Sequence, residues 1–302
     1  MNCLNHPAHH FSPINDAKVN AWMTLFDEEF NNTLSLYHYT SFETACKIIY
    51  GESFRFSSLS NTNDPIESKP KISTNRDEDK LILNHIMNHF ETMNKDKLQL
   101  LCFCKDTVIP DSIKKQHSQF SDYTGRGFAL PRMWAQYANN NKGVCFIIDK
   151  VKLLNDLQTK RIYRNKIIHS DDVSYKSFFE SYSIKHNDLM ELNECINDNS
   201  SIIDYQLLME NLSFIKYNYF KKSRDWQQEN EFRILGFSEN PIYINDIYKY
   251  ILGIIVGEKM EEPEMKMISL LVNNKFDIKK IKFNYNACSL ENLTYKDRNF
   301  YA

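Results

Sequence analysis

Short apolar runs recur along this chain, each bounded by polar residues or glycine and each too short to cross a bilayer. Runs of this length are typical of buried strands. We expect strands at Leu34–Tyr39, Val144–Ile148, Phe232–Phe237, Ile251–Val256 and Ile278–Phe283, with a helix around Glu261–Asn273. No internal repeat or long linker divides the chain. The pattern therefore predicts the α+β class, with a mixed or split antiparallel β-sheet and surrounding helices.

The length and composition allow a substantial core. The chain has 302 residues, of which 42% are hydrophobic and 13% aromatic. We expect a helical N-terminal lead-in over residues 1–33 and a single α+β catalytic-type domain over residues 34–302. Residues 151–222, rich in Asn, Asp, Lys and Tyr, predict a mainly helical insertion that can reach over a site.

Charge and cysteine usage exclude several partners. The net charge of -2 provides no field that attracts nucleic acid or an anionic membrane, and the N-terminus lacks a secretory pattern. Several of the seven cysteines lie in apolar segments, which indicates reduced, buried thiols and a cytoplasmic protein without a membrane partner. Cys102 and Cys104 lack the spacing of a zinc knuckle, so we expect no metal.

The segment Tyr37-His38-Tyr39-Thr40 ends the first apolar run and opens a helix. Thr40 and Glu43 have the spacing of a capping box, and Gly51 is placed to end the helix. A histidine at such a junction can bind a ligand through one ring nitrogen while the main chain holds the other. For a lone histidine the alternative is a purely structural role.

Two further segments place polar side chains near the sheet. In Ser53–Ser57, alternation puts the two Phe on one face and Arg55 on the other. The run Asn61-Thr62-Asn63-Asp64-Pro65 is a turn, whose Asn63 and Asp64 either contact a ligand or only form the turn.

The segment Glu229-Asn230-Glu231 carries the strongest chemical signal. In an extended segment, residues two apart share a face, so both carboxylates and Arg233 can project to one side. Paired carboxylates can stabilise a cationic substrate and handle a proton. The alternative is a solvated, ion-paired strand edge.

A distributed set of motifs between about Leu36 and Gly257 resembles an uncharacterised bacterial family known only as a domain of unknown function, family 2971. The motifs that carry this resemblance are His38-Tyr39-Thr40, Asn63-Asp64-Pro65 with Glu67, Cys102-Phe103, Met133-Trp134, Tyr137-Ala138, Lys142-Gly143-Val144, and Trp226 with Glu229, Glu231 and Arg233. Their common order along the chain makes the resemblance more specific than any one motif.

A more distant resemblance implies an activity. The run from Tyr37 to Thr40, a helix, Gly51 and a strand is similar to the opening of ADP-ribosyltransferase folds, which include bacterial toxins that modify DNA and the RNA 2'-phosphotransferases. In those folds a His or Arg on the first strand holds the NAD ribose, and a Glu on a later strand, matched here by Glu231, completes the site. Their Ser-Thr-Ser strand has no clear counterpart here.

This resemblance implies an ADP-ribosyltransferase-like core that uses NAD as a nucleotide substrate, transfers ADP-ribose to a macromolecular acceptor (protein, RNA or DNA), and acts as a toxin or phage-defence effector. It assigns catalysis to Glu231, Glu229 and His38, and NAD binding to His38, Tyr39, Thr40, Arg55, Asn63, Asp64, Tyr137 and Arg233. In this scheme Tyr39 or Tyr137 stacks on the nicotinamide, and Arg233 pairs with a carboxylate or binds a pyrophosphate.

Two other functions fit the same residues. A hydrolase or nuclease-like effector without NAD would show metal-dependent activity on nucleic acid. A non-catalytic nucleotide- or peptide-binding module would bind its ligand without consuming it.

Overall fold

The computed structural model describes residues 34–293, except for 65, 66, 68, 70, 94–96, 108–122, 161–166, 177–181, 198–211, 274, 285 and 286. The predicted lead-in at residues 1–33 lies outside the described residues, and so does the end of the predicted 34–302 domain. The extent of that domain stays a prediction.

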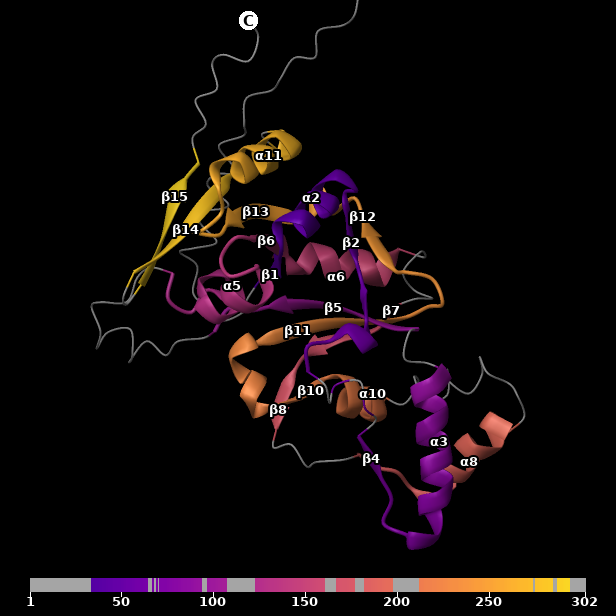
Figure 1. Cartoon of the computed structure of the whole chain (residues 1–302). Coiled ribbons are helices and arrows are strands. Elements are labelled where there is room, and N and C mark those ends of the chain that lie inside the picture. Colours follow the sequence, from indigo (N-terminus) through magenta and orange to yellow (C-terminus); the bar gives the residue numbers. More distant parts are fainter. Residues whose placement is uncertain are drawn as a thin grey trace, which may run out of the picture. The chain divides into compact units, whose positions relative to one another are not determined.

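The described part contains strands, α-helices and short 3-10 helices (Figure 1). The strands are β1 (Ser35–Thr40), β2 (Ser53–Arg55), β3 (Ser57–Ser58), β4 (Ile72–Ser73), β5 (Leu98–Cys104), β6 (Val144–Asp149), β7 (Ile167–Asp172), β8 (Ser174–Lys176), β9 (Tyr182–Ser183), β10 (Lys221–Ser223), β11 (Glu231–Phe237), β12 (Tyr243–Asn245), β13 (Ile251–Val256), β14 (Ile278–Asn284) and β15 (Ala287–Asn292). The α-helices are α2 (Phe42–Tyr50), α3 (Lys80–Met93), α5 (Pro131–Tyr137), α6 (Lys150–Thr159), α8 (His186–Asn197), α10 (Leu212–Tyr219) and α11 (Glu262–Val272). The 3-10 helices are η1 (Leu59–Asn61), η2 (Asp77–Asp79), η3 (Gly127–Ala129), η4 (Arg224–Glu229) and η5 (Ile247–Lys249).

One large sheet organises these elements. Its strands lie in the order β15-β14-β13-β6-β1-β5-β11-β7, and β3 also pairs with β5. Among the described strands of this sheet, β13 and β14 pair in parallel and the other neighbours pair antiparallel. The predicted α+β class with a mostly antiparallel mixed sheet is confirmed, and the predicted strands correspond to β1, β6, β11, β13 and β14.

The strand β5 separates two hydrophobic cores. Its residues Leu101 and Phe103 belong to the larger core, which includes buried residues of α2, α6 and α11. Leu98 and Leu100 belong to the second core, which includes Leu83 of α3 and residues of α8. The helices α3 and α8 pack against each other (Figure 1). Because both faces of β5 are buried, its sequence is continuously apolar from Leu100 to Cys104 rather than alternating.

The first helix begins one residue later than the sequence predicted. Thr40 is the last residue of β1, where it pairs with Val144, so its main chain is extended. The hydroxyl of Ser41 accepts the main-chain N–H of Thr44 at 3.2 Å and is the N-cap instead. Gly51 ends the helix as predicted, with its N–H donating to the carbonyl of Lys47 at 2.9 Å.

The segment 151–222, predicted as a mainly helical insertion, contains strands as well as helices. It contains α8, α10 and most of α6, but it also contains β7, which pairs with β11 at the edge of the main sheet. Within the same segment β10 pairs with β8 in a small parallel ribbon. The expectation of helices therefore describes only part of this segment.

Gly143, just before β6, is packed too closely for a side chain. A Cβ there would overlap the carbonyl oxygen of Thr40 and lie 2.8 Å from the Cα of Ala138. Because the Thr40 carbonyl and the Ala138 Cα are main-chain atoms, Gly143→Ala is expected to lower the free energy of unfolding by about 1–3 kcal/mol in urea titrations. Gly51→Ala is a milder comparison, because its φ of -82° is ordinary for any residue and the nearest atom to a Cβ there, the carbonyl oxygen of Lys47, lies at 3.0 Å, farther than the Thr40 oxygen from a Cβ at Gly143. Equal midpoints for the two variants would contradict this assignment.

Candidate functional site

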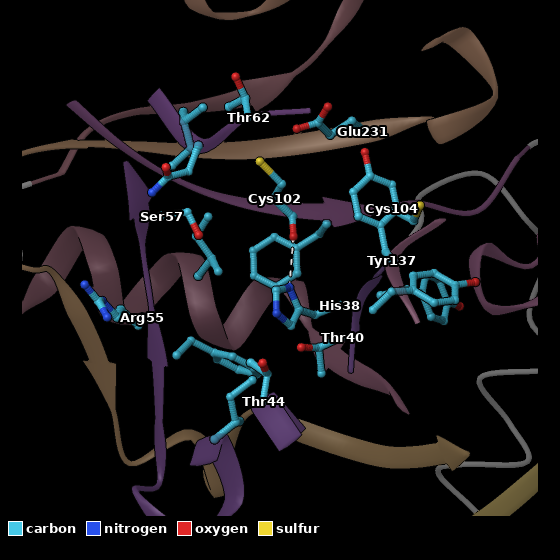
Figure 2. Close-up of a pocket in the computed structure, with 18 of the residues that line it drawn as sticks. His38, Thr40, Thr44, Arg55, Ser57, Thr62, Cys102, Cys104, Tyr137 and Glu231 are labelled. Atoms are coloured by element: carbon cyan, nitrogen blue, oxygen red, sulfur yellow. Dashed lines mark hydrogen bonds between the residues drawn. The ribbon is translucent and has the colours of Figure 1, made fainter. Parts of the chain in front are cut away.

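The sheet is split along one edge of β5. An antiparallel strand has two hydrogen-bonding edges, and β11 covers one of them over the whole length of β5. The strands β1 and β3 share the other edge: β1 pairs with it at Cys104, and β3 pairs with it at Leu100 and Gln99. Cys102 lies between these two pairings. A cavity of about 670 Å³ adjoins this split and is lined from β1, α2, β2, β5, α5 and β11 (Figure 2).

His38 fills part of the split. Its Nδ1 lies 3.1 Å from the carbonyl oxygen of Cys102, so Nδ1 carries the proton and donates (Figure 2). Its ring packs edge-on against Phe54 and Phe103, with centroid distances of 5.2 and 5.7 Å. Burial lowers the pKa of His38 despite the hydrogen bond to Cys102, so the imidazole is neutral at pH 7 and Nε2 is an acceptor.

The two carboxylates do not lie on one extended strand as predicted. Glu229 is the last residue of the 3-10 helix η4, and Glu231 is the first residue of β11. Between them Asn230 adopts a left-handed conformation with φ of 42°. Its side-chain amide donates to the carbonyl oxygens of Lys105 at 3.2 Å and Asp106 at 2.8 Å, which holds this turn. The turn still brings both carboxylates to one cation.

That cation is Lys222 of β10. Its Nζ lies 2.8 Å from Glu229 Oε2 and 2.9 Å from Glu231 Oε2. Arg233 donates to both oxygens of Glu231, with Nε at 2.5 Å from Oε1 and Nη2 at 2.9 Å from Oε2, and it also pairs with Glu67. We call these five residues the charge cluster. They are all buried, and three carboxylates against two cations leave one excess negative charge.

The charge cluster fixes the ionisation of Glu231. Burial by itself would raise the pKa of this carboxyl, but Arg233 and then Lys222 outweigh burial and lower the pKa to about 2. Glu231 is therefore a carboxylate at neutral pH and cannot act there as a general acid. What it offers a ligand is a fixed negative charge. Of the roughly four lone-pair sites on its two oxygens, Arg233 occupies two and Lys222 a third, and the Cys102 thiol also donates to this carboxylate.

Tyr137, at the end of α5, closes the other side of Glu229. Its hydroxyl donates to Glu229 Oε1 at 2.5 Å. Burial, followed by the charge of Glu229, raises the pKa of Tyr137, so the hydroxyl stays protonated as a donor. Glu229 is thus held by Lys222 through one oxygen and by Tyr137 through the other.

The structure brings most of the predicted site residues to the cavity. His38, Thr40, Arg55, Asn63, Tyr137, Glu229 and Glu231 all line it. Tyr39 also lines it, but its hydroxyl donates to the carbonyl of Gly127 at 2.6 Å and its ring packs against Trp134. With the side chain only 8% exposed, Tyr39 offers little surface for stacking, and Tyr137 is the better placed ring.

Two predicted residues do not reach the cavity. Asp64 is buried outside its lining. Arg233 is 0% exposed, and its guanidinium is taken by Glu231, Glu67 and the carbonyl oxygen of Tyr219. Two roles were predicted for Arg233, pairing with a carboxylate and binding a pyrophosphate. The structure shows the pairing, and Arg233 does not line the cavity in which a pyrophosphate would bind.

Sequence reasoning missed Lys222 altogether. It follows Lys221, and a pair of lysines in a polar segment is typical of a solvated surface. Glu67 was quoted only as part of a motif. The position of Lys222 shortly before the Trp226–Arg233 segment was the one signal that could have linked it to the site. The neighbouring residues in the sequence do not indicate that its side chain is buried.

Cys46, Cys102, Cys104, Cys145 and Cys288, the cysteines whose side chains the structure describes, are free thiols. Within the described ranges, no group of three or more His, Cys, Asp or Glu is arranged to hold a metal ion. No helix in the same ranges has both the length and the apolarity of a membrane span.

Residues 133–234 match the family model described as Protein of unknown function (DUF2971). The matched segment includes Tyr137, Lys222, Glu229 and Glu231, but not His38. The match supports the predicted relation to an uncharacterised domain-of-unknown-function family. Neither a curated protein nor a solved structure matches the chain.

Proposed function

We propose that this protein is an ADP-ribosyltransferase-like enzyme that cleaves NAD and transfers ADP-ribose to a macromolecular acceptor. One observation carries the proposal. His38, held by a main-chain hydrogen bond, and Glu231, which is ionised at neutral pH, line the same cavity at the split in the sheet. His38 comes from β1 and Glu231 from β11, the two strands that flank β5.

Glu231 suits the transition state of this reaction. When the bond between nicotinamide and ribose breaks, the electron pair leaves with nicotinamide and positive charge develops on the ribose. A fixed carboxylate stabilises such an oxocarbenium-like state through its charge. Lys222 and Arg233 hold the Glu231 carboxylate in place and ionised, so no reorganisation is required during the reaction.

The other residues of the cavity bind and orient the substrate. The Nε2 of His38 accepts from a ribose hydroxyl, and Thr40 lies beside it on β1. Tyr137 presents its ring to the nicotinamide. Glu229, held by Lys222 and Tyr137, orients the nucleophile of the acceptor. The same arrangement fits a toxin or defence effector that modifies a host or phage macromolecule.

Released nicotinamide is the direct test of this proposal. Purified protein would be incubated with NAD, with and without cell lysate, and nicotinamide would be quantified by chromatography. Release by the wild-type protein would support NAD cleavage, and dependence on lysate would indicate a macromolecular acceptor. No release in either condition would reject it and favour the nuclease-like or binding functions.

Two substitutions of His38 separate its ligand contact from its structural contact. Asparagine can donate to the Cys102 carbonyl as Nδ1 does, but it has no atom in place of Nε2. We expect both His38→Asn and His38→Ala to raise the KM for NAD about tenfold. Both lose the ring contacts with Phe54 and Phe103, but only His38→Ala also loses the hydrogen bond to Cys102, so His38→Ala should lower the melting temperature more. An asparagine variant with wild-type KM would show that His38 is purely structural.

A further inference from the structure

The end of the cavity formed by α2 and β2 is basic. On β2 and β3, Ser53, Arg55 and Ser57 line the cavity with their more exposed side chains, the buried Phe54 lines it as well, and Phe56 is buried outside the lining. On α2, Thr44, Lys47 and Ile48 line the cavity from one helical face.

Lys47 and Arg55, which we call the basic rim, are exposed. Glu43, one turn before Lys47 on α2, attracts it electrostatically, but no carboxylate in the described part of the chain forms an ion pair with either residue of the rim. This sets them apart from Lys222, the other cation of the lining, which is neutralised by Glu229 and Glu231. Lysine and arginine on an open surface need no ligand. Here Lys47 and Arg55 both line one cavity, and the other polar side chains that α2, β2 and β3 contribute to it carry hydroxyl groups.

An aromatic ring lies next to the basic rim. Tyr243 of β12 pairs directly with Arg55 of β2, so the two side chains are on the same face of the ribbon. Tyr243 is 43% exposed and lines the cavity, and is therefore open to stacking by a planar group.

The two ends of the cavity carry opposite charges. The basic rim lies at one end, and the charge cluster, with its excess negative charge, lies at the other. Figure 2 shows Arg55 on the opposite side of the cavity from Tyr137, with His38 between them. A ligand that matches this cavity has an anionic part and, at a distance from it, a hydroxylated or cationic part.

We infer that the basic rim binds the phosphate groups of a nucleoside diphosphate while the ring of Tyr243 stacks on its base. Arginine binds phosphate oxygens in a bidentate manner, and lysine adds a point charge. The inference rests on the proposed function for the choice of NAD. It fixes the direction of NAD in the cavity, with the adenosine diphosphate part at β2 and α2, and the nicotinamide ribose at Glu231.

The test measures binding rather than turnover. Isothermal titration calorimetry would compare ADP-ribose, ADP, adenosine and inorganic pyrophosphate on the wild-type protein and on a Lys47→Ala, Arg55→Ala double variant. The matched control is an Arg76→Ala, Lys152→Ala double variant, which loses the same charge from exposed positions outside the cavity lining. Since all four side chains are exposed, both double variants should fold, as far-ultraviolet circular dichroism would verify.

We expect the basic-rim variant to bind ADP-ribose, ADP and pyrophosphate about tenfold or more weakly, with adenosine and the control variant unchanged. Tyr243→Thr, which keeps a residue suited to a strand, should weaken ADP-ribose and adenosine but leave pyrophosphate unchanged. Equal affinities in the basic-rim and control variants would overturn the inference, and so would a wild-type protein that binds none of the four ligands.

Failure of the proposed function gives a different result. ADP-ribose binding that depends on the basic rim, without nicotinamide release by the wild-type protein, would retain the phosphate site and reject NAD cleavage. Nicotinamide release with an unchanged KM in the basic-rim variant would retain NAD cleavage and overturn the phosphate site.

Discussion

Replacing Glu231 by glutamine is expected to slow nicotinamide release by about a hundredfold or more while the protein remains folded. The substitution removes the charge that stabilises the oxocarbenium-like state but keeps the shape of the side chain. Folding should survive because the charge cluster goes from one excess negative charge to none, with Lys222 and Arg233 still paired with Glu229 and Glu67. Initial rates at saturating NAD, together with melting temperatures, would measure both effects.

Glu229→Gln is the matched control for this prediction. It makes the same change in the net charge of the cluster and lies on the same partner, Lys222. With Glu231 intact, nicotinamide release into water should persist, whereas transfer to the acceptor should fall. If the two variants lose nicotinamide release equally, the effect belongs to the cluster as a whole, and the assignment of the oxocarbenium contact to Glu231 fails.

Replacing Lys222 by methionine should lower the free energy of unfolding by about 3–5 kcal/mol at pH 7. The Lys222 side chain is 6% exposed and pairs with Glu229 and Glu231, so its removal leaves two excess negative charges in a buried cluster. Lys222→Arg keeps the charge and should cost much less. Urea titrations of the three proteins would provide the values, and a methionine variant as stable as the arginine variant would contradict the structural role of the charge.

The loss in the free energy of unfolding caused by Lys222→Met should also depend on pH. In the wild-type protein the pKa of Glu231 is lowered from 4.5 to about 2 in the folded state, so its stabilising contribution is present above pH 4.5 and is lost as pH falls toward 2. Without Lys222 the pKa of Glu231 rises, and uptake of a proton by Glu231 relieves the repulsion among the carboxylates. The stability difference between the wild-type protein and the variant should therefore be larger at pH 7 than at pH 5.

The main strands could be predicted because the apolar runs that indicate them lie within each strand's own sequence. The alternation of Ser53, Arg55 and Ser57 with Phe54 and Phe56 is reproduced in which side chains are buried. The edge strand β7 escaped because only its first residues are apolar, as is common where one face of an edge strand is polar.

The environment of Glu231 and Arg233 could not be predicted from the strand pattern. Their alternation with Phe232 and Ile234 is typical of a strand with one solvated face. In the structure that face is covered, because Lys222 of β10 and Tyr219 of α10 contact it and the second core lies along the same side. The carboxylates therefore meet buried cations from segments that are separate in sequence.

The division of one edge of β5 between β1 and β3 has a consequence for the solubility of the fold. An uncovered stretch of strand edge can recruit a strand from another molecule and start aggregation. Here the stretch at Cys102 is occupied by the ring of His38 and lies in a cavity walled by α2 and the β2–β12 ribbon. The His38 ring thus satisfies the Cys102 carbonyl, and a second polypeptide could pair with this stretch only by displacing that ring.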